Sequence, residues 1–197
     1  MTSILKVDTI QDADGNNIIN ESGNTITVGA SGDTTNIIGT LNKDGLAVTN
    51  TPAFSATRTS NQSAGSANAV TKFQGDIENF DTDSAYDNST NYRFTPQVAG
   101  KYLIYAKFYL DSSSVSAAKQ AISNIYKNGS LYSTYQLDFR NNYGGYDNSV
   151  MNQAIIDMNG SSDYVEAYFQ IVVDSGTGLL ASGTKATEFG GYRLIGA

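Results

Sequence analysis

The aromatic residues of this chain are confined to its second part. All eight Phe and thirteen Tyr lie at or beyond Phe54, and the first 53 residues contain none. Without large rings, such a segment buries only Ile, Leu and Val, each worth about 1.5 to 3 kcal/mol, against an ordering cost of about 1 to 2 kcal/mol per residue. It cannot close a core by itself. We therefore expect two parts that meet near Pro52, the first being either disordered or stabilised by other chains.

Residues 1–51 carry a pattern of short strands. Small groups of aliphatic residues alternate with turn signals such as Asp14-Gly15 and Asp44-Gly45, and no helical period is sustained. Three copies wrapped about a common axis would bury both faces of such strands and satisfy their edges. The alternative is a flexible polar linker rich in Gly, Asn, Ser and Thr. Recurrent aliphatic residues favour the first interpretation.

Residues 52–197 are long enough for a core of their own, and their strand signals are stronger. In the run 101–110, even positions from Tyr102 to Leu110 are apolar, while the odd positions also carry large apolar side chains. The run 163–173 repeats this arrangement. Tyr suits a surface that another subunit covers, because its large apolar ring has a polar tip. The predicted interface between copies comprises Leu103, Tyr105, Tyr109, Tyr164 and Tyr168; the alternative is ordinary scattered surface tyrosines.

The hairpin signal is clearest at Asn128-Gly129, which separates two apolar pairs. Nine or ten strands without a convincing helix predict an antiparallel sandwich of two sheets. The remaining expected strands are 70–73, 92–95, 137–140, 151–158 and 189–195.

Several short segments, in a fixed order, carry a family resemblance. The most specific are the Phe94, Pro96, Gly100, Tyr102 run, the Lys127-Asn128-Gly129 hairpin, the Asp163 and Val165 pair, and the terminal Phe189, Gly191, Tyr192, Leu194 strand. In this order, residues 52–197 resemble the globular head of complement component C-one-q and the tumour necrosis factor fold. The resemblance implies an all-β, ten-strand jelly-roll sandwich that forms a homotrimer, with both ends of the head on one side. It would pair the strand at 53–58 with that at 189–195 and make residues 1–51 a short-strand β stalk.

The opening sequence SILKVDTIQDADGNNII, residues 3–19, resembles the starts of bacteriophage tail-fibre and other virion fibre proteins. This resemblance implies localisation to a virion, in a tail or capsid fibre, after synthesis in the host cytoplasm. Residues 1–51 would then contact other virion proteins.

Composition excludes several classes of function. Twelve basic and nineteen acidic residues give a net charge of −7, and the cations are scattered, so we expect neither nucleic-acid binding nor an anionic-membrane surface. No apolar run approaches a membrane span, and the start lacks a signal peptide. The chain has no Cys and no His, which removes disulfides, thiolate metal sites and the commonest general base. We expect no enzyme activity and no cofactor.

Two polar regions are candidate contact sites. Loops rich in Tyr and Asn would place rings against apolar sugar faces and amides against hydroxyls; such residues are also ordinary in loops. The candidate receptor residues are Tyr86, Asn88, Asn91, Asn141, Asn142, Tyr143 and Tyr146. Asp81, Asp83 and Asp87 resemble half of a calcium loop, but Tyr86 and Tyr92 occupy the positions where that loop needs Gly and Glu, which favours a solvated acidic loop.

The predicted function is that of a bacteriophage virion fibre whose trimeric knob binds a host-surface glycan or protein. The first alternative is a capsid or tail decoration protein without a receptor. A secreted ligand of the tumour necrosis type and a polysaccharide depolymerase are less favoured, because a signal peptide is missing and a head of this size offers no long groove.

Overall fold

A computed structural model covers the chain, and it describes residues 9–11, 13–15, 17–22, 25–28, 31–39, 41–43, 46–65, 68–112, 118–140, 147–182 and 187–195. The chain divides into two compact units, residues 1–48 and 49–197. We call these the N-terminal segment and the head. Within the described residues every element is a strand, and none of them forms a helix long and apolar enough to cross a membrane.

The N-terminal segment contains short antiparallel strands. Strands β1 (Thr9–Gln11), β2 (Asn17–Ser22) and β3 (Thr25–Val28) form one sheet, and β4 (Asn42–Lys43) pairs with β5 (Leu46–Ala47). The turn between β1 and β2 contains Gly15, whose φ of 85° is a conformation that glycine adopts without strain. The predicted alternation of short strands and turns is therefore confirmed where the segment is described.

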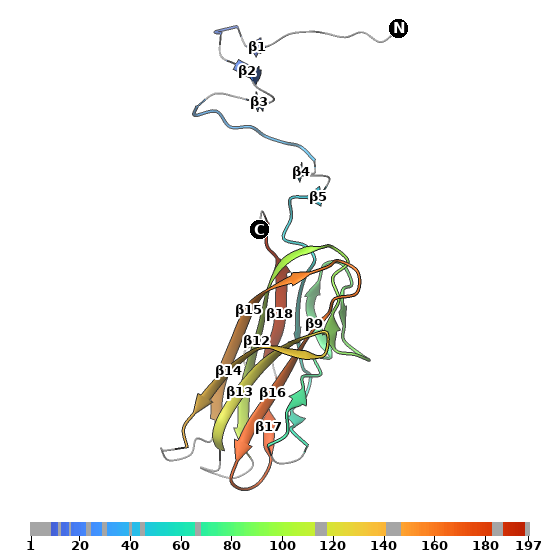
Figure 1. Cartoon of the computed structure of the whole chain (residues 1–197), viewed down its shortest axis with the longest axis vertical. Coiled ribbons are helices and arrows are strands. Elements are labelled where there is room, and N and C mark those ends of the chain that lie inside the picture. Colours follow the sequence, from blue (N-terminus) through green and yellow to red (C-terminus); the bar gives the residue numbers. More distant parts are fainter. Residues whose placement is uncertain are drawn as a thin grey trace. The chain divides into compact units, whose positions relative to one another are not determined.

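The head is a sandwich of two antiparallel sheets (Figure 1). The seven-stranded sheet has the order β7-β17-β12-β18-β6-β9, and β15 also pairs with β12, along nearly its whole length. Its bounds are β6 (Ala53–Thr57), β7 (Gln62–Ser63), β9 (Ile77–Asp81), β12 (Gly100–Ser112), β15 (Asp147–Met158), β17 (Gly178–Leu180) and β18 (Glu188–Arg193).

The six-stranded sheet has the order β10-β11-β16-β13-β14, with β8 also paired to β16. Its bounds are β8 (Thr71–Lys72), β10 (Tyr86–Asp87), β11 (Arg93–Phe94), β13 (Ala118–Lys127), β14 (Ser130–Asp138) and β16 (Val165–Val173). In Figure 1 strands β13, β14 and β16 lie in front of β12, β15 and β18.

Strand pairing confirms two of the sequence predictions. The β13–β14 hairpin turns at Asn128 and Gly129, both with positive φ, as a two-residue turn of this type requires. Strand β6 pairs with β18, with Ala53 opposite Tyr192, so the first and last strands of the head are neighbours. The head has thirteen described strands against nine or ten predicted; the additional ones are β7, β9, β10 and β17, which have two to five residues each.

The core between the sheets is built from aromatic rings. The even positions of β12 from Tyr102 to Leu110 are fully buried, and so are the alternating residues Val165 to Ile171 of β16, as the period of two predicted. Phe54 stacks on Phe94 at a centroid distance of 4.3 Å and meets Phe189 edge-on at 4.9 Å. Six of the eight Phe are fully buried, which accounts for the confinement of aromatic residues to the head.

Candidate functional site

The five residues predicted to lie between copies are divided between the two sheets. Leu103, Tyr105 and Tyr109 alternate with buried residues of β12, so they lie on the outward side of the seven-stranded sheet. Tyr168 belongs to β16, and Tyr164 directly precedes that strand. Both lie on the outward side of the six-stranded sheet. The structure therefore forms two candidate surfaces, which we call the apolar face and the tyrosine face.

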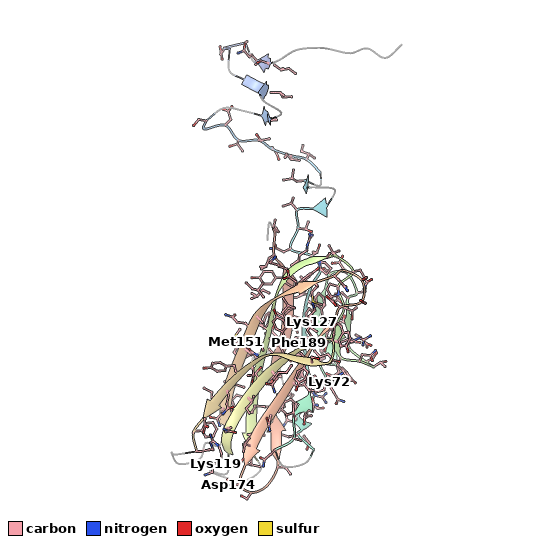
Figure 2. The ribbon with its side chains drawn as sticks, viewed as in Figure 1. Lys72, Lys119, Lys127, Met151, Asp174 and Phe189 are labelled. Atoms are coloured by element: carbon pink, nitrogen blue, oxygen red, sulfur yellow. The ribbon has the colours of Figure 1, made fainter. Side chains whose placement is uncertain are left out.

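The apolar face is the outward side of the seven-stranded sheet. Leu103 lies opposite Ile155 of β15 and opposite Tyr192 of β18, which forms a row across three strands. Ile155 is 56% exposed and Tyr192 is 37% exposed. Met151 of β15, labelled in Figure 2, and Phe80 of β9, at the far edge of the sheet, are about half exposed on the same side. Large apolar side chains gathered on one sheet face indicate an interaction surface.

A polar network lies at the centre of the apolar face. The Tyr105 hydroxyl donates to Glu188 Oε1 at 2.7 Å, and the Ser55 hydroxyl donates to the same oxygen at 2.6 Å. Asn79 Nδ2 donates to Ser55 Oγ at 2.9 Å, and Lys107 Nζ lies 3.8 Å from Glu188 Oε2. Burial, followed by the hydrogen bond to Glu188, raises the pKa of Tyr105 above its ordinary value. The Glu188 carboxylate is therefore held by donors from β12 and β6.

Gly190 makes this network possible. A Cβ at Gly190 would lie 2.4 Å from the Tyr105 hydroxyl and 2.6 Å from the ring carbon that carries it. The absence of a side chain lets the Tyr105 ring lie across β18 and reach Glu188. A glycine inside a strand often marks such a close approach.

Replacement of Gly190 by alanine should lower the free energy of unfolding by about 1 to 3 kcal/mol, because the Tyr105 ring must leave its place over β18. Chemical denaturation of the purified variant measures this loss. In a Tyr105→Ala background the same replacement should cost less, since no ring remains to be displaced. Equal costs in both backgrounds would contradict the assigned contact.

The tyrosine face contains a partly buried ion pair. Lys72 Nζ lies 2.5 Å from Glu166 Oε1, and the Glu166 side chain is only 7% exposed. The Tyr168 hydroxyl donates to Glu166 Oε2 at 3.3 Å, and its ring lies 4.3 Å from that of Tyr126 in a tilted arrangement. Burial, then the charge of Glu166, raises the pKa of Tyr168 to about 12. Tyr168 is thus partly covered within its own chain.

Tyr164 has a different neighbour. The guanidinium carbon of Arg93 lies 4.4 Å from the centroid of the Tyr164 ring, within the range of a cation–π contact. Phe94 pairs with Val165, which places β11 beside β16 and brings Arg93 to this ring. Sequence alone does not mark Arg93 or Lys72 as site residues, since nothing in their local sequence shows which strands lie beside them.

The loop at residues 88–92 borders the tyrosine face. The Asp87 carboxylate accepts hydrogen bonds from the backbone N–H groups of Ser89, Thr90 and Asn91 at 2.9 to 3.0 Å. These bonds, that from Thr90 first, hold the pKa of Asp87 well below its usual range, so the carboxylate stays ionised. Lys72 Nζ donates to the carbonyl of Asn91 at 3.1 Å. The loop is therefore attached to the ion pair of the tyrosine face.

The predicted receptor residues have different positions. Asn91 is exposed and Asn88 is partly exposed on this loop. Tyr86 corrects the prediction, because it lies in the core at 5% exposure, stacks on Phe54 and donates its hydroxyl to the Gly75 carbonyl. A ring buried in this way cannot contact a receptor. Asn141, Asn142, Tyr143 and Tyr146 lie outside the described residues.

The acidic residues of the calcium-like sequence bind their own loop. The Asp81 carboxylate accepts from the backbone N–H of Tyr86 at 2.8 Å, and Asp83 accepts from the Thr82 hydroxyl at 2.6 Å. Asp87 holds the 88–92 loop instead. Within the described parts of the chain, no group of three acidic, His or Cys side chains is placed to hold a metal ion.

Comparison with known proteins identifies a fold. No family model matches the sequence, and no curated protein is similar to it. Among solved structures, the Eiger TNF from S. frugiperda matches with a TM-score of 0.51 at 12% identity, covering 74% of this chain and 93% of that one. Murine APRIL at pH 5.0 matches with a TM-score of 0.50 at 12% identity, covering 72% and 98%. At this identity the similarity shows the fold alone, which is a tumour necrosis factor-like jelly roll.

Proposed function

We propose that this jelly roll is the head of a homotrimeric bacteriophage fibre protein that attaches the particle to a glycan or protein on the host surface. The observation that carries the proposal is the apolar face. In a single chain, Ile155, Met151 and Phe80 are about half exposed on one side of one sheet. Association of copies would remove this apolar area from water, at about 25 cal/mol for each Å² buried.

The N-terminal segment supports the same assembly. Among its described residues, Ile37, Ile38 and Leu41 are 53%, 94% and 52% exposed. These residues lie between β3 and β4, and exposed aliphatic side chains gain stability when other chains cover them. Other copies of the segment, or other proteins of the particle, would provide that cover. The resemblance of residues 3–19 to phage fibre proteins supports a place in a virion.

A decoration protein without a receptor is the second candidate. The apolar face favours it equally, because association of copies does not require a receptor. The two candidates differ only in whether another surface of the head binds a ligand. For either role the expected absence of catalysis and of a cofactor remains a prediction.

Two measurements test the proposal on the full-length protein. Sedimentation velocity should give three times the chain mass of 21.0 kDa. The labelled trimer, applied to an array of bacterial surface polysaccharides and to immobilised bacterial outer-surface protein, should then bind a subset of the spots. A trimer that binds none of them would support the decoration protein and contradict attachment. A folded monomer at micromolar concentration would contradict the fibre itself.

A further inference from the structure

The tyrosine face remains accessible if copies associate through the apolar face, because the two lie on opposite sheets of the sandwich. Its rings come from neighbouring strands. Tyr126 of β13 and Tyr168 of β16 form a tilted pair, and Tyr164 lies two residues before Glu166 on the same side. All three tyrosines are only partly buried. Partly exposed rings of this kind offer apolar area together with polar hydroxyls.

Arg93 is a cation without an acidic partner on this face. Within the described residues, no carboxylate lies within 4.0 Å of its guanidinium, although the chain has a net charge of −7. Asp87 is its direct cross-strand neighbour in the β10–β11 pair. The Asp87 carboxylate, however, is directed to the amides of residues 89–91. Asp87 thus lies opposite Arg93, but its carboxylate binds the amides of its own loop instead of the guanidinium.

Lys72, unlike Arg93, has an acidic partner. Its ammonium is already paired with the Glu166 carboxylate and bonded to the Asn91 carbonyl. The free positive charge of the tyrosine face is therefore at Arg93, which is held over the Tyr164 ring. A guanidinium binds a carboxylate through two parallel hydrogen bonds, which gives both strength and orientation. The Arg93 guanidinium is therefore complementary to a planar anionic group such as a carboxylate.

We infer that the tyrosine face binds a carboxylate-bearing sugar of a host-surface polysaccharide, with Arg93 holding the carboxylate and the tyrosine rings contacting the sugar ring. Asn88, on the adjoining loop, supplies an amide for hydroxyl groups, while the Asn91 side-chain amide donates to Asp87 at 2.8 Å and leaves its carbonyl oxygen as an acceptor. The inference rests on the proposed attachment function and names its ligand class. It also assigns Tyr164 and Tyr168 to ligand contact rather than to the surface between copies.

The test uses acidic oligosaccharides with neutral counterparts. Tri-galacturonate is compared with its methyl ester, and sialyllactose with lactose, by calorimetric titration into the assembled full-length protein. At least one acidic sugar should bind, its neutral counterpart should bind at least about tenfold more weakly, and added salt should weaken the acidic one. Arg93→Gln should lower the affinity for the acidic sugar by about tenfold or more. Arg93→Lys, which keeps the charge without the fork, should give a smaller loss.

Lys119→Gln is the matched control. Lys119 is paired with Asp174 at 3.0 Å, and Figure 2 shows both at the opposite end of the sandwich from Lys127. This variant removes the same unit of charge at a distance from the tyrosine face, so its affinity should equal that of the unchanged protein. An equal loss in Lys119→Gln and Arg93→Gln would mean that net charge alone governs binding and would overturn the inference.

The remaining outcomes separate this inference from the function on which it rests. If the array binds the trimer but Arg93→Gln binds the array equally well, attachment stands and the tyrosine face is not its site. If neither acidic sugar binds while the array does, the ligand class is wrong. If neither the array nor any sugar binds, the attachment function itself fails. If Arg93→Gln does not fold, Arg93→Lys is used instead. An affinity of Arg93→Lys for the acidic sugar equal to that of the unchanged protein would exclude the two-bond contact.

Discussion

Replacement of Ile155 by lysine should convert the assembled protein into a folded monomer of 21.0 kDa. Ile155 is 56% exposed in the single chain, so a lysine there disturbs little of the fold. In a trimer, however, each copy would bring one charge into a dry apolar contact, and an unpaired charge removed from water costs several kcal/mol. Association should weaken by at least about 100-fold. Sedimentation equilibrium over a range of concentrations measures this change.

Val70→Lys is the control for this experiment. Val70 is an aliphatic residue of similar exposure, 46%, and it directly precedes β8 of the six-stranded sheet. The same change in charge there should leave the trimer intact. If Ile155→Lys keeps the trimer mass, the apolar face does not join the copies. If both variants dissociate, an added positive charge weakens the trimer at either position, and the experiment does not locate the contact at the apolar face.

Truncation of Phe54 to alanine should lower the free energy of unfolding by about 3 to 5 kcal/mol. The ring is 1% exposed and lies between Tyr86, Phe94 and Phe189, so its loss leaves a cavity among aromatic rings that cannot collapse easily. Domains of this size have only about 5 to 15 kcal/mol of stability. Urea denaturation followed by tyrosine fluorescence measures the change.

Phe80→Ala is the matched control for Phe54→Ala. Phe80 is opposite Ser55 in the β6–β9 pair, one residue from the level of Phe54, but it is 50% exposed. Both variants are compared in the Ile155→Lys background, so that dissociation of copies does not contribute. The control should lose less than about 1 kcal/mol. Similar losses for the two variants would show that the ring cluster does not form the core of the head.

The period of two was sufficient to predict which residues of the long strands are buried. Both sides of β12 and β16 carry large apolar side chains, but only one side of each strand is free of charged residues, and that side lies inward. The Asn128-Gly129 turn and the pairing of β6 with β18 were also predicted, the first from local turn chemistry and the second from the family resemblance. These features depend on neighbours in sequence or on an established fold.

The candidate surfaces could not be predicted to the same degree. Alternation shows that Tyr105 and Tyr168 face away from the core, but it does not show that their strands belong to opposite sheets. The sequence around Tyr86 is typical of a loop, yet Tyr86 lies in the two-residue strand β10 and its ring stacks on Phe54. Arg93 and Glu188 become recognisable only when strands distant in sequence are brought together.

The pairing of β6 with β18 has a mechanical consequence. Strand β6 begins the head, and it is hydrogen-bonded to β18 on one side and to β9 on the other. Tension transmitted along the polypeptide into Ala53 would pull β6 parallel to its own axis, while the hydrogen bonds of both ladders run across that axis. Many bonds would then share the load in shear instead of opening one after another. In the proposed fibre, a particle tethered in flowing liquid would exert such a force.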